Sequence, residues 1–152
     1  GCYIASQIPE KNFILNDGFC HVHTSIYKEE LLHAKELHPD ALVLSHPECR
    51  ENVLEISDFI GSTSEILSFA ERSEAKEFII CTEMGVFYEL ELKNPNKKFY
   101  SVGHRQFCPN MKKISLEKVL YAMETLEPVV EIDEKLRIKA AKPLSRMLEL
   151  AK

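Results

Sequence analysis

The sequence predicts an α/β protein, a three-layer αβα sandwich around a short parallel sheet. Short apolar runs such as ALVLS (41–45) and FIIC (78–81) lack the alternation of a half-exposed strand. Such runs are typical of strands that helices cover on both faces. Amphipathic stretches follow the apolar runs in turn, which is the pattern of repeated β-α units.

Each expected strand is followed by an expected helix. The strands are expected at 13–16, 41–45, 58–60, 77–81 and 98–102. The helices that follow them are expected at 27–37, 50–56, 62–72, 86–93 and 115–126. A last helix is expected at about 134–151, with Asp133 as its N-cap. Pro143 inside this stretch predicts a kink or a helix in two parts.

Composition and charge argue against two classes of partner. Of the 152 residues 45% are hydrophobic, which is enough to bury a core, and the net charge is −5. Adjacent lysines occur only as two isolated pairs, at 97–98 and 112–113, so no basic stripe is available for phosphates. No apolar run approaches the roughly 20 residues of a membrane span. We therefore expect a cytoplasmic protein that binds neither nucleic acid nor membrane.

The five cysteines predict free or metal-bound thiols. Their number is odd, they form no CxxC pair, and the sequence lacks secretory features, which argues against a disulfide framework. The chain also starts without methionine, and residues 2–5 resemble the end of a helix. We therefore expect the carboxyl-terminal piece of a longer protein.

Side chains capable of catalysis or ligand binding follow every predicted strand. In chain order they are Cys20 and His23, His46 and Glu48, Ser62 and Thr63, Thr82 and Glu83, and His104 and Cys108. Ligands of open parallel sheets bind outside the carboxyl ends of the strands, so these groups would meet at one edge. The sequence therefore predicts an active site there, although any one of these polar loops is also explained by solvation alone.

Two of these motifs have both a catalytic and a structural explanation. HPEC (46–49) places an imidazole beside a carboxylate, as acid/base chemistry requires, but it also fits a turn with a helix-capping glutamate. GSTSE (61–65) offers hydroxyl and amide groups to an anion at a helix start. Ser62 and Glu65 equally fit a capping box.

The thiol motifs are ambiguous when they are taken alone. The proline after Cys108 occurs after some iron–sulfur ligands. Cys20 and His23 suit zinc only with two further ligands. Cys49 and Cys81 are explained equally well as small buried hydrophobic residues.

Longer motifs resemble one known family. They are GFCHVH, ELHPDALVLSHPEC, DFIGSTSEIL, AKEFIICTEMG, NPNKKFY, CPNMKKISLEKVLYAME and IKAAKPLSRML. In this order they resemble the carboxyl-terminal half of bacterial and archaeal quinolinate synthases, over nearly the whole chain. The resemblance implies a transferase of NAD biosynthesis that condenses iminoaspartate with dihydroxyacetone phosphate, with loss of phosphate and water.

The resemblance also implies an architecture of three αβα domains around a pseudo-threefold axis. Residues 1–20 would end one domain, 21–107 would form a complete domain, and 108–152 would be helices that pack on a domain absent from this chain. The amino-terminal half would be the chief partner, and without it we expect the chain to be inactive. The aspartate-oxidising enzyme that supplies iminoaspartate is a further candidate partner.

The family's cofactor is a 4Fe-4S cluster at the centre of the three domains. By resemblance Cys20 and Cys108 are two of its three ligands, and the third cysteine would lie upstream of Gly1. Three protein ligands leave one iron open as a Lewis acid.

The resemblance assigns the remaining roles as well. His23 would reach the substrate, Glu48 would move protons with His46 beside it, and Ser62 and Thr63 would bind a carboxylate or phosphate. His21 would be a solvated loop residue, and Cys49 would be spare.

Two other functions remain open on the sequence. A zinc-dependent hydrolase would use Cys20, His23, His46 and Glu48, whereas a non-catalytic α/β interaction module would bind no metal and tolerate the loss of Glu48.

Overall fold

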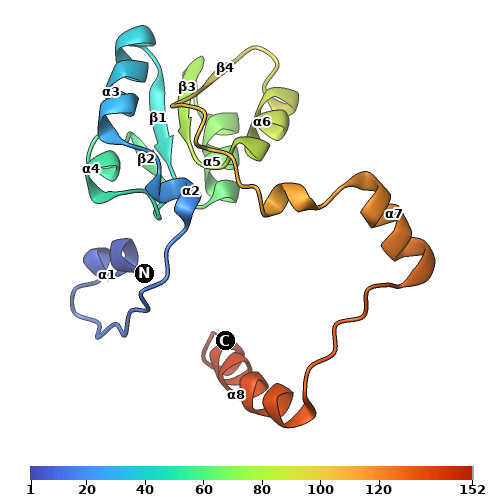
Figure 1. Cartoon of the computed structure of the whole chain (residues 1–152). Helices are drawn as coiled ribbons and strands as arrows, with labels where there is room; N and C mark the ends of the chain where they lie inside the picture. Colours follow the sequence, from blue (N-terminus) through green and yellow to red (C-terminus); the bar gives the residue numbers. More distant parts are fainter. Residues whose placement is uncertain (152) are drawn as a thin grey trace. The chain divides into compact units, whose positions relative to one another are not determined.

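The computed structural model of the chain describes residues 1–151. The fold divides into two units, Gly1–Pro109 and Asn110–Lys152. The first unit contains the whole sheet, and the second contains helices (Figure 1).

A four-stranded, all-parallel sheet forms the centre of the first unit, in the order β2-β1-β3-β4. Its strands are β1 (Leu42–Ser45), β2 (Phe59–Ile60), β3 (Glu77–Cys81) and β4 (Lys98–Ser101). The register places Ser45 opposite both Ile60 and Cys81. Four of the five predicted strands are thereby confirmed.

Helices cover both faces of this sheet, which confirms the αβα sandwich. Alternate residues of a strand point to opposite faces. Val43 and Ile79 pack with α3 (Lys28–Leu37) and α4 (Glu51–Leu54), through Leu31 and Val53 among others. On the other face, Leu44, Phe78 and Ile80 pack with α5 (Thr63–Arg72) and α6 (Phe87–Lys93). All the residues named here as packing are buried.

The predicted strand at 13–16 is wrong. These residues have no strand partner, and they lie between two short helices, α1 (Cys2–Gln7) and α2 (His21–Thr24). Ile14 is 97% exposed in this chain, and Phe13 and Leu15 are also exposed. The apolar character of the run favours burial, but a strand also needs a neighbouring strand to pair with. The helix expected at 2–5 is confirmed by α1.

The second unit contains η2 (Met111–Lys113), α7 (Leu116–Thr125) and α8 (Glu134–Leu150). The side chains of Ser115 and Asp133 accept hydrogen bonds from backbone N–H groups at the two helix starts. Asp133 is thus the N-cap that the sequence predicts. Of the two alternatives predicted for Pro143, a helix in two parts is wrong, because α8 runs from Glu134 to Leu150 through the proline. The kink stays a prediction.

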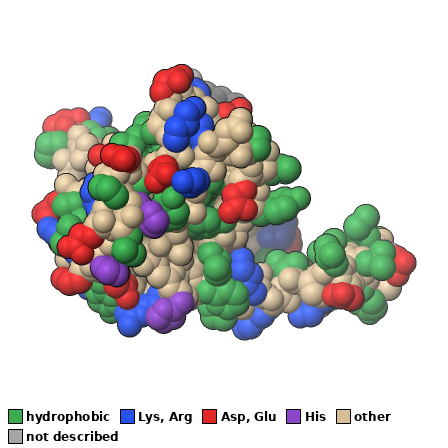
Figure 2. Space-filling model, turned by 90° about the horizontal axis from the view of Figure 1, so that it is seen from above, with side chains coloured by type: hydrophobic (Ala, Val, Ile, Leu, Met, Phe, Trp, Pro, Cys, Tyr) green, Lys and Arg blue, Asp and Glu red, His purple; other side chains and the backbone are tan. Residues whose placement is uncertain are grey.

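Large hydrophobic side chains of the second unit are exposed. Figure 2 shows them crowded on α7, at the right of the view, and no residue of α7 or α8 is buried. None of the helices described for residues 1–151 has the length and apolar character that a membrane crossing requires.

Candidate active site

The order of the strands places the switch point of the sheet, where crevices form in open α/β sheets, at the carboxyl ends of β1 and β3. The chain leaves β1 toward α4 on one face of the sheet and leaves the adjacent β3 toward α6, through η1 (Met84–Val86), on the other face. Loops that diverge from neighbouring parallel strands leave room between them, and ligands of open α/β sheets bind at such points. The loops that follow β1 and β3 hold His46, Glu48 and Thr82.

The loop after β1 is fixed by the backbone. His46 N donates to Cys81 O at 3.2 Å, which extends the pairing of β1 with β3 by one step. Cys49 N then donates to His46 O at 2.9 Å, closing a turn around Pro47. Glu48 is therefore held at the tip of this turn, and its side chain is 48% exposed. It caps no helix, because α4 begins at Glu51 with Arg50 as its N-cap, so the capping explanation of HPEC is wrong.

The helix α2 brings His23 to the same place. Cys20 is its N-cap residue, and Cys20 O accepts from Thr24 N at 3.0 Å. At the other end of α2, Arg50 Nε donates to Thr24 O at 2.6 Å, which ties the helix to the loop after β1. His23 is the most buried histidine that the site contains, with 7% of its surface exposed.

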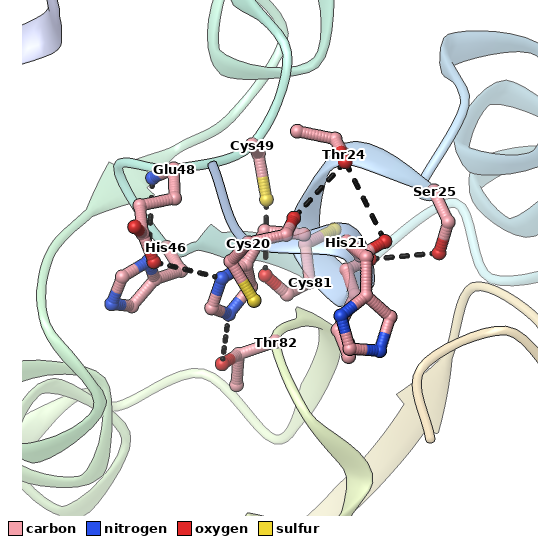
Figure 3. Close-up of polar contacts among 11 residues, drawn as sticks. Cys20, His21, Thr24, Ser25, His46, Glu48, Cys49, Cys81 and Thr82 are labelled. Atoms are coloured by element: carbon pink, nitrogen blue, oxygen red, sulfur yellow. Dashed lines mark hydrogen bonds and ion pairs between the residues drawn. The ribbon is translucent and has the colours of Figure 1, made fainter. Parts of the chain in front are cut away.

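His23 is held on three sides. Its Nδ1 lies 3.2 Å from Glu48 Oε2, its Nε2 lies 3.0 Å from Thr82 Oγ1, and its ring stacks on His46 with centroids 4.0 Å apart (Figure 3). A carboxylate oxygen can only accept, so Nδ1 carries the proton of the neutral ring. Nε2 then accepts a hydrogen bond from the Thr82 hydroxyl. The two partners together select the Nδ1–H tautomer.

Burial keeps both imidazoles neutral. The pKa of His23 lies below its ordinary value, chiefly because burial penalises the charged ring and secondarily because His46 is adjacent. Glu48 opposes this shift but does not reverse it. The pKa of His46 is lowered by burial too, and its Nδ1 lies 3.6 Å from Glu48 Oε2. One carboxylate thus faces two neutral imidazoles, an arrangement that can pass protons to and from a bound molecule.

Cys20 completes the group. Its Sγ, a ring nitrogen of His23 and a carboxylate oxygen of Glu48 all lie within 4.8 Å of one another. Within residues 1–151 this is the one place where three such ligand atoms come so close. A thiol, an imidazole and a carboxylate at this spacing are able to hold a metal ion.

Known proteins match the chain over nearly its full length. The family described as quinolinate synthetase A protein matches residues 1–149. The chain belongs to the quinolinate synthetase A family. Relatives named quinolinate synthase come from Caldicellulosiruptor saccharolyticus, with 50% identity over 151 residues, and from Thermodesulfovibrio yellowstonii, with 45% identity over 148 residues. These alignments cover 99% and 97% of this chain but 50% and 49% of the relatives. The chain therefore spans about half the length of the curated relatives that it matches.

Cys108 of this family member lies on the β3 and β4 side of the crevice. Its backbone N–H donates to Glu83 Oε1 at 3.1 Å, so the segment that holds Cys108 is tied to the loop after β3. Cys108 is buried, and it is not among the three residues, Cys20, His23 and Glu48, whose donor atoms could share one metal ion.

The buried Gln106 fixes this side of the candidate site, and no local sequence pattern indicates it. Its Nε2 donates to Ile80 O and to Thr82 O, both at 2.6 Å, and its Oε1 accepts from Val102 N at 2.6 Å. Gln106 thus bridges the ends of β3 and β4, and it supports the residue that holds His23. Thr82 was predicted only as a polar strand end, and its bond to His23 joins residues 59 positions apart.

The remaining predicted site residues lie at the start of α5 or at exposed positions. Ser62 and Thr63 follow β2 at the same edge, and Ser62 forms the capping box with Glu65 that the sequence predicted as one alternative. Thr63 is exposed at the first position of α5. His104 is exposed after β4. His21 is exposed as predicted, although it lies in α2 and not in a loop.

Cys49 and Cys81 are core residues. Both are buried, all five cysteines are free, and Cys49 Sγ donates to Cys81 O at 3.3 Å. Burial raises the pKa of Cys81 to about 12 and raises that of Cys49 as well, so both thiols stay protonated at neutral pH.

Proposed function

We propose that this chain is part of a quinolinate synthase, a transferase that condenses iminoaspartate with dihydroxyacetone phosphate and releases phosphate and water. The observation that supports this most is the family match over residues 1–149, combined with the His23–Glu48 pair at the carboxyl edge of the sheet. The family favours this activity over a zinc hydrolase or an interaction module. The pseudo-threefold arrangement of domains, with boundaries after residues 20 and 107, belongs to the same proposal.

The proposed cofactor is a 4Fe-4S cluster held by Cys20, Cys108 and a third cysteine from outside this chain. The donor chemistry fits: Cys20 and Cys108 are free thiols, and both belong to segments tied to the loops at the carboxyl edge of the sheet. Cys49 and Cys81 do not fit, because they lie among the apolar residues of the core. A cluster with three protein ligands supplies an open iron that polarises a substrate oxygen.

Glu48 is the proposed acid/base. Its side chain is half-exposed toward the crevice while one of its oxygens is held by the Nδ1–H of His23. This leaves the other oxygen to take a proton from a substrate carbon or to return one to a leaving hydroxyl. Neutral His46 beside it is able to accept or donate the same proton.

His23 is proposed to orient Glu48 and to bind the substrate. Both ring nitrogens have partners, so contact with a substrate requires the substrate to replace Glu48 or Thr82 at one of them. Thr63 at the start of the ten-residue α5 is proposed to bind the phosphate or carboxylate, because a helix start favours an anion. Ser62 already uses its hydroxyl to cap that helix.

The remaining half of the synthase is the proposed main partner, because the relatives are about twice as long as this chain. Exposed apolar side chains supply a surface for it, both in residues 13–19 and along α7 and α8. We propose that the chain alone is inactive.

Cluster assembly in a full-length synthase that contains this chain tests the cofactor. After anaerobic reconstitution with iron and sulfide, Cys108→Ser should lose the brown absorption and the bound iron, whereas the matched thiol variant Cys49→Ser should keep both. A four-iron cluster that persists in Cys108→Ser, or that disappears in Cys49→Ser while the protein stays folded, would overturn the ligand assignment.

A further inference from the structure

We propose that Glu83 is the positioning residue of Cys108, because its carboxylate holds the segment that carries this thiol before any cluster binds. The inference rests on the proposed function, since Cys108 is a cluster ligand only in the proposed synthase. Glu83 directly follows the strand end at Cys81 and Thr82. It is not among the residues proposed to bind substrate or to move protons.

Both oxygens of the Glu83 carboxylate accept hydrogen bonds from backbone N–H groups. Oε2 accepts from Gly85 N at 2.7 Å, with Glu83 as the N-cap residue of η1. Oε1 accepts from Cys108 N at 3.1 Å, across 25 positions of the sequence. The bond to Gly85 keeps the carboxylate in place, and the bond from Cys108 ties the cysteine to it. Carboxylates accept such bonds more strongly than neutral oxygens do.

Two further hydrogen bonds join the loop after β3 to the segment of Cys108. Met84 N donates to Gln106 O at 2.8 Å, and Gln106 Nε2 donates to Thr82 O at 2.6 Å. Both bonds use backbone atoms of the loop, so they survive a substitution of Glu83. The two segments therefore stay side by side in such a variant, and the change acts on Cys108 itself.

These bonds bury one thiol in a segment that is otherwise exposed. Cys108 is 8% exposed, whereas its neighbours Phe107 and Pro109 are exposed. Exposed segments open easily, so the burial of Cys108 depends on the bonds that hold its backbone. Ligands of metal sites are typically oriented by such neighbouring partners, and a ligand that is already in place has less order to gain when the cluster binds.

Alkylation of the metal-free chain with N-ethylmaleimide tests this role, with each cysteine followed by mass spectrometry of its peptide. In Glu83→Ala we expect Cys108 to react about 10- to 100-fold faster than in the wild type, because the segment opens more often. Cys49 and Cys81 are buried in the core and should keep their wild-type rates in the same sample. Glu83→Gln keeps one acceptor oxygen, so its Cys108 rate should be intermediate.

Glu65 provides the matched control. It also accepts a hydrogen bond from a backbone N–H group, that of Ser62 at 2.7 Å, at the start of α5. Glu65→Ala should leave the alkylation rate of Cys108 unchanged. An unchanged Cys108 rate in both Glu83 variants would overturn the proposal. So would a rate that rises together with those of Cys49 and Cys81 in both variants, or that rises as much in Glu65→Ala.

Reconstitution of the full-length synthase shows whether this positioning serves the cluster. With iron and sulfide under anaerobic conditions, the brown absorption should develop more slowly in Glu83→Ala than in Glu65→Ala. Equal rates in these two variants would contradict a role for Glu83 in cluster binding. A wild-type synthase that binds no cluster would refute the proposed cofactor instead, whereas the alkylation rates of the metal-free chain would still decide whether Glu83 holds Cys108.

Discussion

Glu48 is the residue whose position makes the strongest case for chemistry. It stands at the tip of the turn after β1, half-exposed, with one oxygen bound by His23. In Glu48→Gln the amide oxygen still accepts from His23 Nδ1, so the geometry survives while the proton-transfer group is lost. We expect turnover of the full-length synthase to fall by about 10²- to 10⁴-fold with the cluster spectrum unchanged. Quinolinate formation under anaerobic conditions measures this.

A surface glutamate provides the control for that experiment. Glu36 lies on α3, exposed and paired with His33 away from the crevice. The full-length synthase with Glu36→Gln should turn over at the wild-type rate. Near-normal turnover in Glu48→Gln as well would remove Glu48 from the proposed mechanism.

Thr63 and Ser62 can be separated because only Ser62 caps α5. Thr63→Ala should raise the KM for a substrate and leave the unfolding free energy nearly unchanged. Ser62→Ala should lower the unfolding free energy by about 1 kcal/mol, since it removes the hydroxyl that accepts from Glu65 N. Steady-state kinetics and urea unfolding of the same two variants distinguish substrate binding by Thr63 from helix capping by Ser62. An unchanged KM in Thr63→Ala would refute its role in substrate binding.

At the scale of single residues, the sequence predicts the side chains of the site better than it predicts their hydrogen-bond partners. His46 and Glu48 could be placed because they directly follow a recognisable strand. The partners of His23 could not, since the bonds to Glu48 and Thr82 span 25 and 59 positions. They depend on β3 lying beside β1, and strand order is not encoded in any local pattern. Gln106 was missed for the same reason, because nothing local marks a glutamine that bridges two strands.

At the scale of elements, Gln106 holds the ends of β3 and β4 together. It is 1% exposed and bonds to three backbone groups at 2.6 Å. Gln106→Met keeps the length of the side chain but leaves these groups unpaired. We expect the unfolding free energy of the chain to fall by about 3–5 kcal/mol, measured by urea unfolding.

The buried Asn94 is a matched control, because its side chain donates one hydrogen bond, to Leu90 O at the end of α6. Asn94→Leu should cost about 1 kcal/mol. Equal losses in the two variants would show that Gln106 is an ordinary buried amide.

The burial of Cys81 in β3 makes the unfolding free energy of the chain depend on pH in the alkaline range. Burial raises the pKa of Cys81 to about 12, whereas an unfolded cysteine titrates near 8.5. Above about pH 8.5 the unfolded chain therefore binds fewer protons than the folded chain, so stability falls as pH rises. The expected loss from Cys81 is about 1.4 kcal/mol per pH unit between pH 9 and 11.

Urea unfolding across this range in the wild type and in Cys81→Ala tests the effect. Cys81→Ala should be less stable at pH 7 but should have the shallower pH dependence. If the unfolding free energy fell equally steeply with pH in the two proteins, Cys81 would not contribute to the pH dependence.

The elements themselves were largely predictable, with one instructive failure. The runs at 41–45 and 77–81 are apolar and pair in the centre of the sheet as β1 and β3. The run at 13–16 is equally apolar but has no partner strand within this chain, and its side chains are exposed. Hydropathy reports that a segment favours burial, whereas pairing is decided by which other segments are present.

At the scale of the whole molecule, the exposed apolar surface and the length of the relatives agree. A chain with about half the relatives' length leaves many large hydrophobic side chains of residues 110–151 in contact with water. Exposed surfaces of this kind mark interaction sites. The remaining half of the synthase is the partner that we propose for them, and its addition should complete both the cluster and the substrate pocket.

The most direct test of the account is therefore the rate of quinolinate formation from iminoaspartate and dihydroxyacetone phosphate, with cluster-loaded protein under anaerobic conditions. We predict no turnover by the chain alone and turnover when the other half of the synthase is present. Turnover by the chain alone, or none by a full-length protein that has bound its cluster, would contradict the account.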